Sequence, residues 1–285
     1  PKTRADEEKI SNALKRLSEE DPTLTVERKA ESHELLVSGM GQVHLDVNLE
    51  RMKRRFGVEV DVKMPKVPYR ETIRGSTKVQ GRHKKQSGGR GQFGDTWIEI
   101  SPMVKGGGFV FEDNIVGGAI PKTYIPAVKK GIQEAMVGGV VAGYPMVDIK
   151  IRLYDGSYHD VDSSEVAFKI AGSLGFKKGV IDCRPILLEP IMIMDIVVPS
   201  DFVGDIMGDI NSKRGKILGI DADDNNQNIR AEVPMSEVLN YAADINSMTS
   251  GRGVFSMEFD HYDDVPEHLK AKIIERINFV SKIKN

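Results

Sequence analysis

The order of strand and helix patterns over residues 188–259 constrains the fold more than any other feature of this chain. Two helical patterns, beginning at Pro199 and at Ser236, alternate with apolar runs typical of strands. The predicted strands are Leu188–Val198, Lys216–Ile220, Ile229–Val233 and Val254–Phe259. The resulting order, βαββαβ, is that of the ferredoxin-like split βαβ domain.

Residues 1–66 show the same order without its opening strand. A first helix has a capping-box-like start at Thr3 and Asp6 and ends before Pro22, and a second helix ends at Gly57. The predicted strands are Leu24–Arg28, Glu34–Ser38 and Val58–Val62. We therefore expect a second ferredoxin-like domain, αββαβ, whose first strand is missing and precedes residue 1.

The segment between them, residues 67–187, has a different pattern. Strand signals at Gly94–Ser101 and Gly108–Phe111 precede a long helix, and Val147–Leu153 follows it. The two predicted helices are Pro121–Val137 and one that begins at Asp162–Ser164; Asp155-Gly156 reads as a turn. We expect an α+β domain in which the ends Gly81–Gly94 and Asp155–Asp160 project from one sheet.

Composition excludes several classes of protein. The single cysteine, Cys183, rules out an intrachain disulfide and a multi-cysteine metal site, and it indicates a reducing compartment. No apolar run is long enough to predict a membrane-spanning helix, and the first residues do not resemble a signal peptide. The expected location is cytoplasmic.

The net charge of −2 hides an uneven distribution of 40 basic and 42 acidic residues. Residues 67–187 carry a net +5, residues 188–265 a net −10, and residues 266–285 a net +3. Residues 72–94 contain six lysines and arginines and no acid. Such a run is either a solvated surface or a surface that contacts phosphates, and composition alone leaves both interpretations open.

The glycine-rich motif Gly89–Gly94 fits GxGxxG, but it follows a basic run and leads into a strand instead of a helix. This context argues against a dinucleotide site and favours a cationic glycine hairpin whose backbone approaches phosphates. The chain contains no GxxxxGK followed by Ser or Thr, so we expect no P-loop nucleotide binding. An RNA-recognition module is disfavoured because Lys216–Ile220 and Ile229–Val233 lack aromatic residues.

His159 lies close to Ser157, Ser163 and Ser164, which raises the alternative of a hydrolase. No GxSxG motif accompanies these residues, so nucleophilic catalysis is disfavoured. The six histidines form no HExxH or other close ligand pair, so no metal site is expected.

Several long stretches resemble one family, bacterial elongation factor G. Its domain III opens with a helix similar to KTRADEEKISNALKRLSEEDPTL, and its domain IV contains stretches similar to KKQSGGRGQFG, IVGGAIPKTYIPAVKKGIQEAM and YDGSYHDVDSSEVAFKIAGS. Its domain V contains stretches similar to GDINSKRGKILGI and FDHYDDVP. The resemblance extends over nearly the whole chain.

The resemblance implies two ferredoxin-like split βαβ domains flanking an α+β domain like that of ribosomal protein S5. Domain III would be 1–66, domain IV 67–187, domain V 188–265, and a helical tail 266–285. The expected function is that of the ribosome-binding part of a translational GTPase that promotes tRNA–mRNA translocation. A recycling or ribosomal-protection paralogue of the same architecture is the alternative.

The implied partners are the ribosome, through 16S and 23S rRNA and proteins of both subunits, and the tRNA–mRNA pair; the chain itself is expected to be monomeric. This fragment is expected to have no enzymatic activity and no cofactor, whereas the full-length parent is expected to use GTP and Mg. The implied decoding-site tip comprises Lys84, Lys85, Gln86, Ser87, Gly88, Gly89, Arg90, Gly91, Gln92, Ser157, Tyr158, His159 and Asp160. The implied large-subunit RNA contact comprises Ser212, Lys213, Arg214, Gly215 and Lys216. The implied GTPase-relay region comprises Gly39, Gly41 and His44, within the Gly39–Leu45 segment.

Three features depart from the family pattern. The GTP-binding domain and the barrel domain that follows it have no counterpart in this sequence. Asp95 stands where many members have His, which places an acid beside the tip, and the sequence after Leu269 is longer than usual. The last two features are the reason for keeping a divergent paralogue as an alternative.

Overall fold

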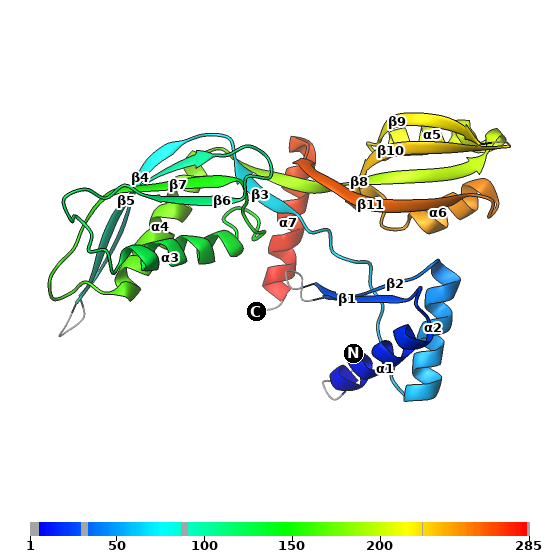
Figure 1. Cartoon of the computed structure of the whole chain (residues 1–285), viewed down its shortest axis with the longest axis horizontal. Coiled ribbons are helices and arrows are strands. Elements are labelled where there is room, and N and C mark those ends of the chain that lie inside the picture. The colour runs from blue at the N-terminus through cyan, green and yellow to red at the C-terminus, as the bar shows by residue number, and fades with distance from the viewer. Residues whose placement is uncertain (1–5, 30–33, 87–90, 224, 284–285) are drawn as a thin grey trace. The chain divides into compact units, whose positions relative to one another are not determined.

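A computed structural model describes residues 6–29, 34–86, 91–223 and 225–283 of the chain. The chain divides into two compact units, residues 1–68 with 190–261 and residues 69–189 with 262–285 (Figure 1). Each contains helices packed on sheets, so the predicted α+β class is confirmed. Among the described residues, no helix combines the length and the apolarity needed to span a membrane.

The N-terminal domain (the predicted 1–66) contains two helices and one hairpin. Helix α1 (Asp6–Glu20) precedes strands β1 (Thr25–Lys29) and β2 (Glu34–Ser38), which pair antiparallel, and α2 (Gln42–Phe56) follows. The core is formed by Ile10, Ala13, Leu14, Leu17, Leu24, Met52 and Val58. Gly57 ends α2 with φ of 64°, as predicted, because a left-handed residue there closes the last turn. The predicted cap at Thr3 lies outside the described residues.

The predicted strand Val58–Val62 is wrong. These residues are irregular, although Val58 is buried in the domain core. In the ferredoxin-like order the last strand pairs only with the first, and no equivalent of that first strand occurs among the described residues of this domain. An alternating pattern cannot form a strand without a neighbour to satisfy its backbone groups.

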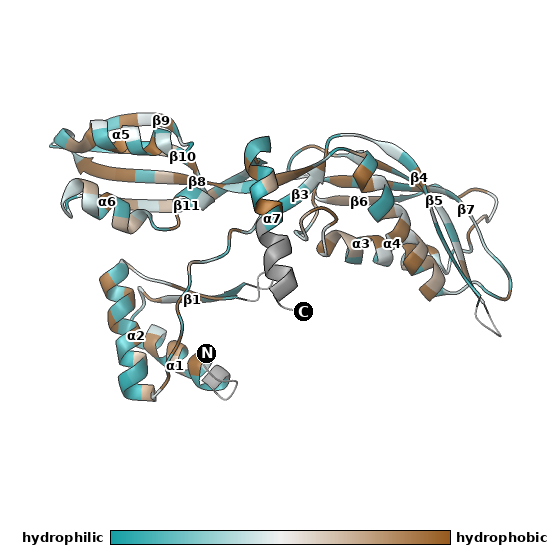
Figure 2. Ribbon diagram, turned by 180° about the vertical axis from the view of Figure 1, so that it is seen from behind, coloured by the Kyte–Doolittle hydropathy of each residue, from teal (hydrophilic) through white to brown (hydrophobic). Residues whose placement is uncertain are grey.

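The C-terminal domain (188–265) has the complete order. It comprises β8 (Pro185–Pro199), α5 (Val203–Ser212), β9 (Lys216–Asp223), β10 (Asn226–Pro234), α6 (Tyr241–Thr249) and β11 (Val254–Asp264). The strand order β11-β8-β10-β9 confirms the ferredoxin-like prediction. Figure 2 shows β8 as predominantly hydrophobic, in line with its central place in that sheet. The helix expected from Ser236 begins instead at Tyr241, after a 3-10 turn at Met235–Glu237.

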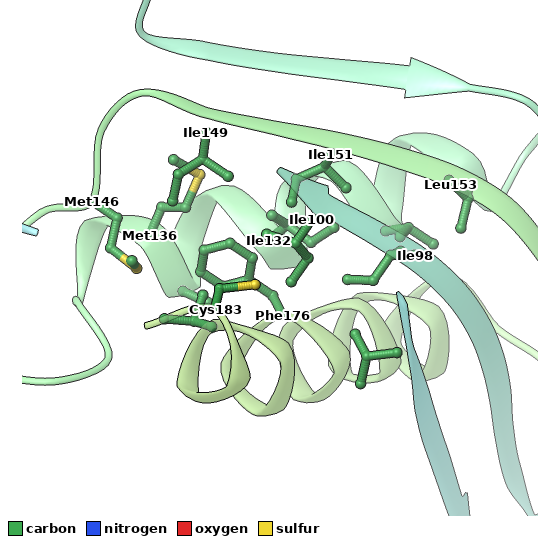
Figure 3. Close-up of a cluster of buried hydrophobic side chains, with 14 of the residues drawn as sticks. Ile98, Ile100, Ile132, Met136, Met146, Ile149, Ile151, Leu153, Phe176 and Cys183 are labelled. Atoms are coloured by element: carbon green, nitrogen blue, oxygen red, sulfur yellow. The ribbon is translucent and has the colours of Figure 1, made fainter. Parts of the chain in front are cut away.

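The middle domain (67–187) is built on a four-stranded sheet of order β4-β5-β7-β6. Its strands are β4 (Thr77–Lys85), β5 (Gln92–Pro102), β6 (Phe109–Asp113) and β7 (Ile149–Ser157), and its helices are α3 (Ile125–Val137) and α4 (Glu165–Asp182). Only β6 and β7 run parallel, since α3 connects them. Both helices contribute to one core with Ile98, Ile100, Ile151 and Phe176 (Figure 3).

Two sequence interpretations of this domain are corrected. The basic run contains a strand, β4, which polar residues concealed. Asp155-Gly156 is not a turn but part of β7, opposite Trp97 and Thr96 of β5. Glycine is needed at 156 because a Cβ there would lie 2.4 Å from the Asp95 carbonyl oxygen and 2.5 Å from Ile120.

Strand β3 and helix α7 complete the second unit. Strand β3 (Arg70–Ile73) pairs with the first residues of β8, and helix α7 (Glu267–Ile283) packs through Leu269 on a small apolar cluster with Leu187 and Val265. Glu71 is fully buried, and its carboxylate accepts four backbone N–H groups from residues 140–144 at 2.7–3.1 Å. That carboxylate fixes the loop after α3.

Candidate nucleic-acid interface

The end of the β4–β5 hairpin presents the predicted tip. Lys84 pairs with Phe93 and Lys85 with Gln92, so the hairpin strands remain paired up to the described residues on either side of 87–90 (Figure 1). Ser87, Gly88, Gly89 and Arg90 lie outside the described residues. Of the predicted tip residues that are described, only Gly91 is half-buried; the exposed ones are Lys84, Lys85, Gln86, Gln92, Ser157, Tyr158, His159 and Asp160.

A second loop, residues 158–164 after β7, is joined to this hairpin by hydrogen bonds. The Asp162 carboxylate accepts the Gly91 N–H at 2.9 Å, and its backbone carbonyl accepts the Phe93 N–H at 2.9 Å. The buried Ser163 hydroxyl donates to the Phe93 carbonyl and accepts the His159 N–H, both at 2.9 Å. The structure therefore joins the described end of the hairpin, Gly91–Phe93, to the second predicted tip loop.

Asp162 and Ser163 were not predicted as site residues. The sequence assigned them to a helix start, and Ser164 does cap α4 by accepting the Ala167 N–H at 3.2 Å. The capping signal in this stretch was visible, but the contact with a hairpin about 70 residues away was not. The only sign of that contact in the sequence is that Asp162, Ser163 and Ser164 supply more polar side chains than one helix cap needs.

Two glycines of the hairpin serve its packing. A Cβ at Gly94 would lie 2.7 Å from the Ala167 carbonyl oxygen in α4, and one at Gly91 would lie 2.9 Å from the Asp162 carboxylate. The sequence predicts that these glycines allow the backbone to approach a phosphate closely. Their described environment is instead the interior of the tip, where a side chain would separate the hairpin from α4.

His159 is placed at the exposed surface of the second loop. Its Nδ1 accepts the N–H groups of Val161 and Asp162, both at 3.3 Å. An imidazole that accepts at Nδ1 carries its proton on Nε2, so the ring presents a donor outward. The hydroxyls of Ser157, Ser163 and Ser164 are directed to Asp95, Phe93 and the Ala167 N–H respectively. Among the described hydrogen bonds, none joins one of these hydroxyls to the imidazole ring of His159, so this geometry does not support the hydrolase alternative.

The Asp95 carboxylate lies within the sheet, next to the strand ends that carry the tip, and is not exposed to solvent. Its side chain is buried and accepts hydrogen bonds from Gln80 at 2.8 Å and from Ser157 at 3.0 Å. These contacts join β4, β5 and β7 where the two loops leave the sheet. The aspartate at position 95, where many family members have His, is thus satisfied by hydrogen bonds within the sheet.

The turn from Ser212 to Lys216 contains the other predicted contact, and its three cations differ. The Lys213 ammonium lies 2.5 Å from Asp209 and 3.2 Å from Asp244, with its side chain 17% exposed. Arg214, with φ of 59°, pairs with Glu237 at 3.0 Å. Lys216 is 76% exposed, with Glu232 at 3.8 Å. Only Lys216 projects from this turn as a largely solvated charge.

The contacts of Lys213 also change the pKa values of Lys213 itself and of the neighbouring Tyr241. Burial by itself would lower the pKa of the Lys213 ammonium, but its hydrogen bonds to Asp209 and Asp244 outweigh burial and raise that pKa. Burial, together with the same two carboxylates, raises the pKa of the Tyr241 phenol well above its ordinary value. Lys213 is therefore a fixed link between α5 and α6. The prediction that it contacts RNA is not supported by its surroundings.

The predicted relay region is organised by His44. Its Nδ1 accepts the Met40 N–H at 3.1 Å, and its Nε2 lies 2.6 Å from Asp21 at the end of α1. Hydrogen bonds from Thr23 and His44 lower the pKa of Asp21 to about 2. A Cβ at Gly39 would lie 2.5 Å from His44 Nδ1, so glycine is required there. Gly41 begins α2 in extended backbone with open space around it.

The fold and these loops define a modular α+β protein whose middle domain carries a cationic double loop at one end of its sheet. Comparison with known families matches almost the whole sequence in three consecutive parts. Residues 1–64 match elongation factor G domain III, residues 65–184 match elongation factor G domain IV, and residues 186–273 match the elongation factor G C-terminus. The chain belongs to the elongation factor G family.

A solved structure is similar to this chain over almost its whole length. A crystal structure of a protein from Thermus thermophilus is 45% identical to this chain, with a TM-score of 0.85 over 98% of it. The chain spans 42% of the length of that protein.

Proposed function

We propose that this chain is the ribosome-binding C-terminal part of a translational GTPase that promotes movement of tRNA and mRNA during protein synthesis in the cytoplasm. The observation that carries the proposal is the double loop of the middle domain. Exposed cations and polar groups project from a body that Asp162 and Ser163 hold rigid. A surface that must hold a moving RNA substrate needs this combination of charge and fixed geometry.

In this proposal the tip contacts the tRNA–mRNA pair in the decoding centre. The Lys84 and Lys85 ammonium groups offset phosphate charge, and the outward His159 Nε2–H donates a hydrogen bond. The remaining proposed tip residues are those named above, including the four outside the described residues.

The C-terminal domain contacts large-subunit RNA, with Lys216 as the charged residue of the Ser212–Lys216 turn. The net charge of −10 over residues 188–265 repels RNA in general, so a contact there depends on such local cations. The N-terminal domain relays the state of the GTPase through Gly39, Gly41 and His44, because His44 joins that turn to the end of α1.

We propose no nucleotide or metal site within the described part of this chain. The sequence has no P-loop, and the described residues contain no group of three or more acidic, histidine or cysteine side chains placed to hold a metal. Nucleotide and metal belong, in this proposal, to the part of the parent protein that this chain does not include. The chain itself is proposed to act as a monomer with no enzymatic activity.

The decisive experiment measures translocation and phosphate release in single turnovers of the full-length protein. Lys84→Glu with Lys85→Glu is expected to slow tRNA–mRNA movement about tenfold or more while leaving GTP hydrolysis nearly unchanged, because one lost hydrogen bond to a charged group costs about 1.5–3 kcal/mol. The matched control is Lys177→Glu with Lys178→Glu, two exposed lysines on α4. Equal slowing by the control, or no slowing by the tip variant, contradicts the proposal.

His159 provides a second arm. His159→Ala removes the ring and the acceptor of two loop N–H groups, whereas His159→Asn retains a side-chain acceptor for the loop. If the outward Nε2–H matters, both variants slow movement; if only loop geometry matters, Asn rescues it. A recycling assay on the same variants distinguishes translocation from the recycling function of a paralogue.

A further inference from the structure

The sheet of the middle domain has two unlike faces. Along β5, Thr96, Ile98 and Ile100 are fully buried on the face that α4 covers. The alternate residues Phe93 and Trp97 are half-buried on the other face. Figure 1 shows α3 and α4 together on one side of this sheet.

Three aromatic rings share the face without helices. Trp97 lies opposite Gln80 of β4 and Asp155 of β7. Tyr154 is the extra residue where the β5–β7 register shifts, and such a bulge directs it to the same side as its neighbour Asp155. Phe93, four residues nearer the tip along β5, completes the set, with Asp95 between it and Trp97 on this face. These three rings come from the two central strands of the sheet.

Two cations of β4 lie against these rings. The Lys78 ammonium is 5.7 Å from the centre of the Tyr154 ring, and the Arg82 guanidinium is 5.6 Å from the centre of the Phe93 ring. Both side chains are exposed, and neither has a carboxylate partner among the described residues. Further along the same face, Arg152 is paired with Glu99. The cations without a carboxylate within ion-pair distance therefore lie beside the rings, and the exposed Asp155 carboxylate lies on the same face next to Tyr154.

We propose that this open sheet face, formed by Lys78, Arg82, Phe93, Trp97 and Tyr154, binds an unpaired strand of RNA. Half-buried rings with adjacent cations match the two parts of such a ligand, bases that stack and phosphates that carry charge. A duplex does not fit, because its bases are already stacked and cannot reach the rings. The inference rests on the proposed ribosomal function and adds a contact surface separate from the tip loops.

The chain supplies its own probe, because Trp97 is its only tryptophan. The experiment titrates the full 285-residue chain with an oligouridylate of roughly ten nucleotides at low salt. Binding is followed by anisotropy of a dye on the RNA and, independently, by Trp97 emission. Stacking at this face is expected to quench Trp97 along the same binding curve that anisotropy gives.

Variants test each part of the surface. Lys78→Gln with Arg82→Gln is expected to lower the slope of log affinity against log salt by roughly 0.7 for each cation removed. Tyr154→Leu, which keeps an apolar side chain at the bulge, is expected to weaken binding about fivefold or more. Lys177→Gln with Lys178→Gln removes two exposed charges from α4, away from this face, and is expected to change neither quenching nor the slope.

The outcomes are separable from those of the translocation assay, because no tip residue is changed and no GTPase is needed. Anisotropy without Trp97 quenching places RNA elsewhere and overturns the proposal. Equal loss from the α4 pair shows nonspecific attraction and overturns it as well. Absence of RNA binding overturns the proposal and leaves these cations as protection of an edge strand. Equal quenching by polyglutamate also overturns the proposal, because it indicates a contact with an acidic protein.

Discussion

The two cationic regions that the sequence marks as RNA contacts differ in what surrounds their charges. At the tip, Lys84 and Lys85 are exposed and have no carboxylate partner among the described residues. In the Ser212–Lys216 turn, Lys213 and Arg214 are held by carboxylates of α5, α6 and the 3-10 turn between β10 and α6. Similar charge in the sequence thus has two environments: the tip lysines remain exposed to solvent, whereas Lys213 and Arg214 are neutralised by carboxylates of neighbouring elements.

The difference teaches that a cation's role is decided by which acids the fold brings to it. Asp209 is four residues from Lys213 at the end of the same helix, a spacing readable from sequence. Asp244 and Glu237 are separated from Lys213 and Arg214 along the sequence by strands β9 and β10. No local pattern identifies them as partners.

The largest effect expected from this comparison is on stability. Lys213→Ala leaves Asp209, only 16% exposed, beside Asp244 without its cation, and is expected to lower the free energy of unfolding by about 3 kcal/mol. Lys216→Ala, at 76% exposure, is expected to change it by less than about 0.5 kcal/mol. Urea unfolding followed by circular dichroism measures both. Similar values for the two variants would erase the distinction between these lysines.

The complementary effect is on ribosome binding. Lys84→Gln with Lys85→Gln is expected to weaken binding about tenfold at low salt and to reduce its salt dependence, because two phosphate contacts are lost. Lys213→Gln with Arg214→Gln is expected to leave the salt slope unchanged, since those charges are already neutralised. Sedimentation with ribosomes at several salt concentrations tests this. A reduced slope for the second pair would return Lys213 and Arg214 to the RNA contact.

A smaller effect concerns the rigidity of the tip. Ser163→Ala removes a buried hydroxyl that links Phe93 to the second loop, and is expected to cost about 1–2 kcal/mol locally. Hydrogen exchange at the His159 and Phe93 amides is then faster, while exchange in the C-terminal domain is unchanged. Ser76→Ala, at an exposed position between β3 and β4 of the same domain, serves as the control. Unchanged exchange at both amides would mean that Asp162 alone joins the loops.

At neutral pH the smallest effect is a pH dependence of the middle domain, which develops only above about pH 9. Burial raises the pKa of the Cys183 thiol to about 11, above the value of 9.0 for an exposed thiol. The unfolded chain therefore loses this proton first, and stability falls as pH rises from about 9 to about 11, by about 1 kcal/mol near pH 9.5. Urea titrations at several pH values, compared with Cys183→Ala, measure it. A stability difference between the two chains that is independent of pH would contradict the shifted pKa.

The two ferredoxin-like patterns make the limits of sequence-based prediction concrete. In the C-terminal domain the pattern predicts every strand, and the β11-β8-β10-β9 order follows from the fold it indicates. In the N-terminal domain the same alternation at Val58–Val62 forms no strand, because the described chain supplies no neighbour for it. Periodicity reports which side of a segment is apolar, whereas a strand also needs a partner for its backbone.

The sequence by itself determined the α+β class, the helix stop at Gly57, the family, and the chemical character of the tip. Each of these depends on local spacing or on long collinear motifs. Tertiary structure alone decided that β4 exists within a polar run and that Asp162 and Ser163 bind the hairpin. It also decided that Lys213 is neutralised and that Phe93, Trp97 and Tyr154 share one face. The physical reason is that hydrogen bonds, ion pairs and ring contacts depend on distance in space, and folding makes neighbours of residues far apart in the chain.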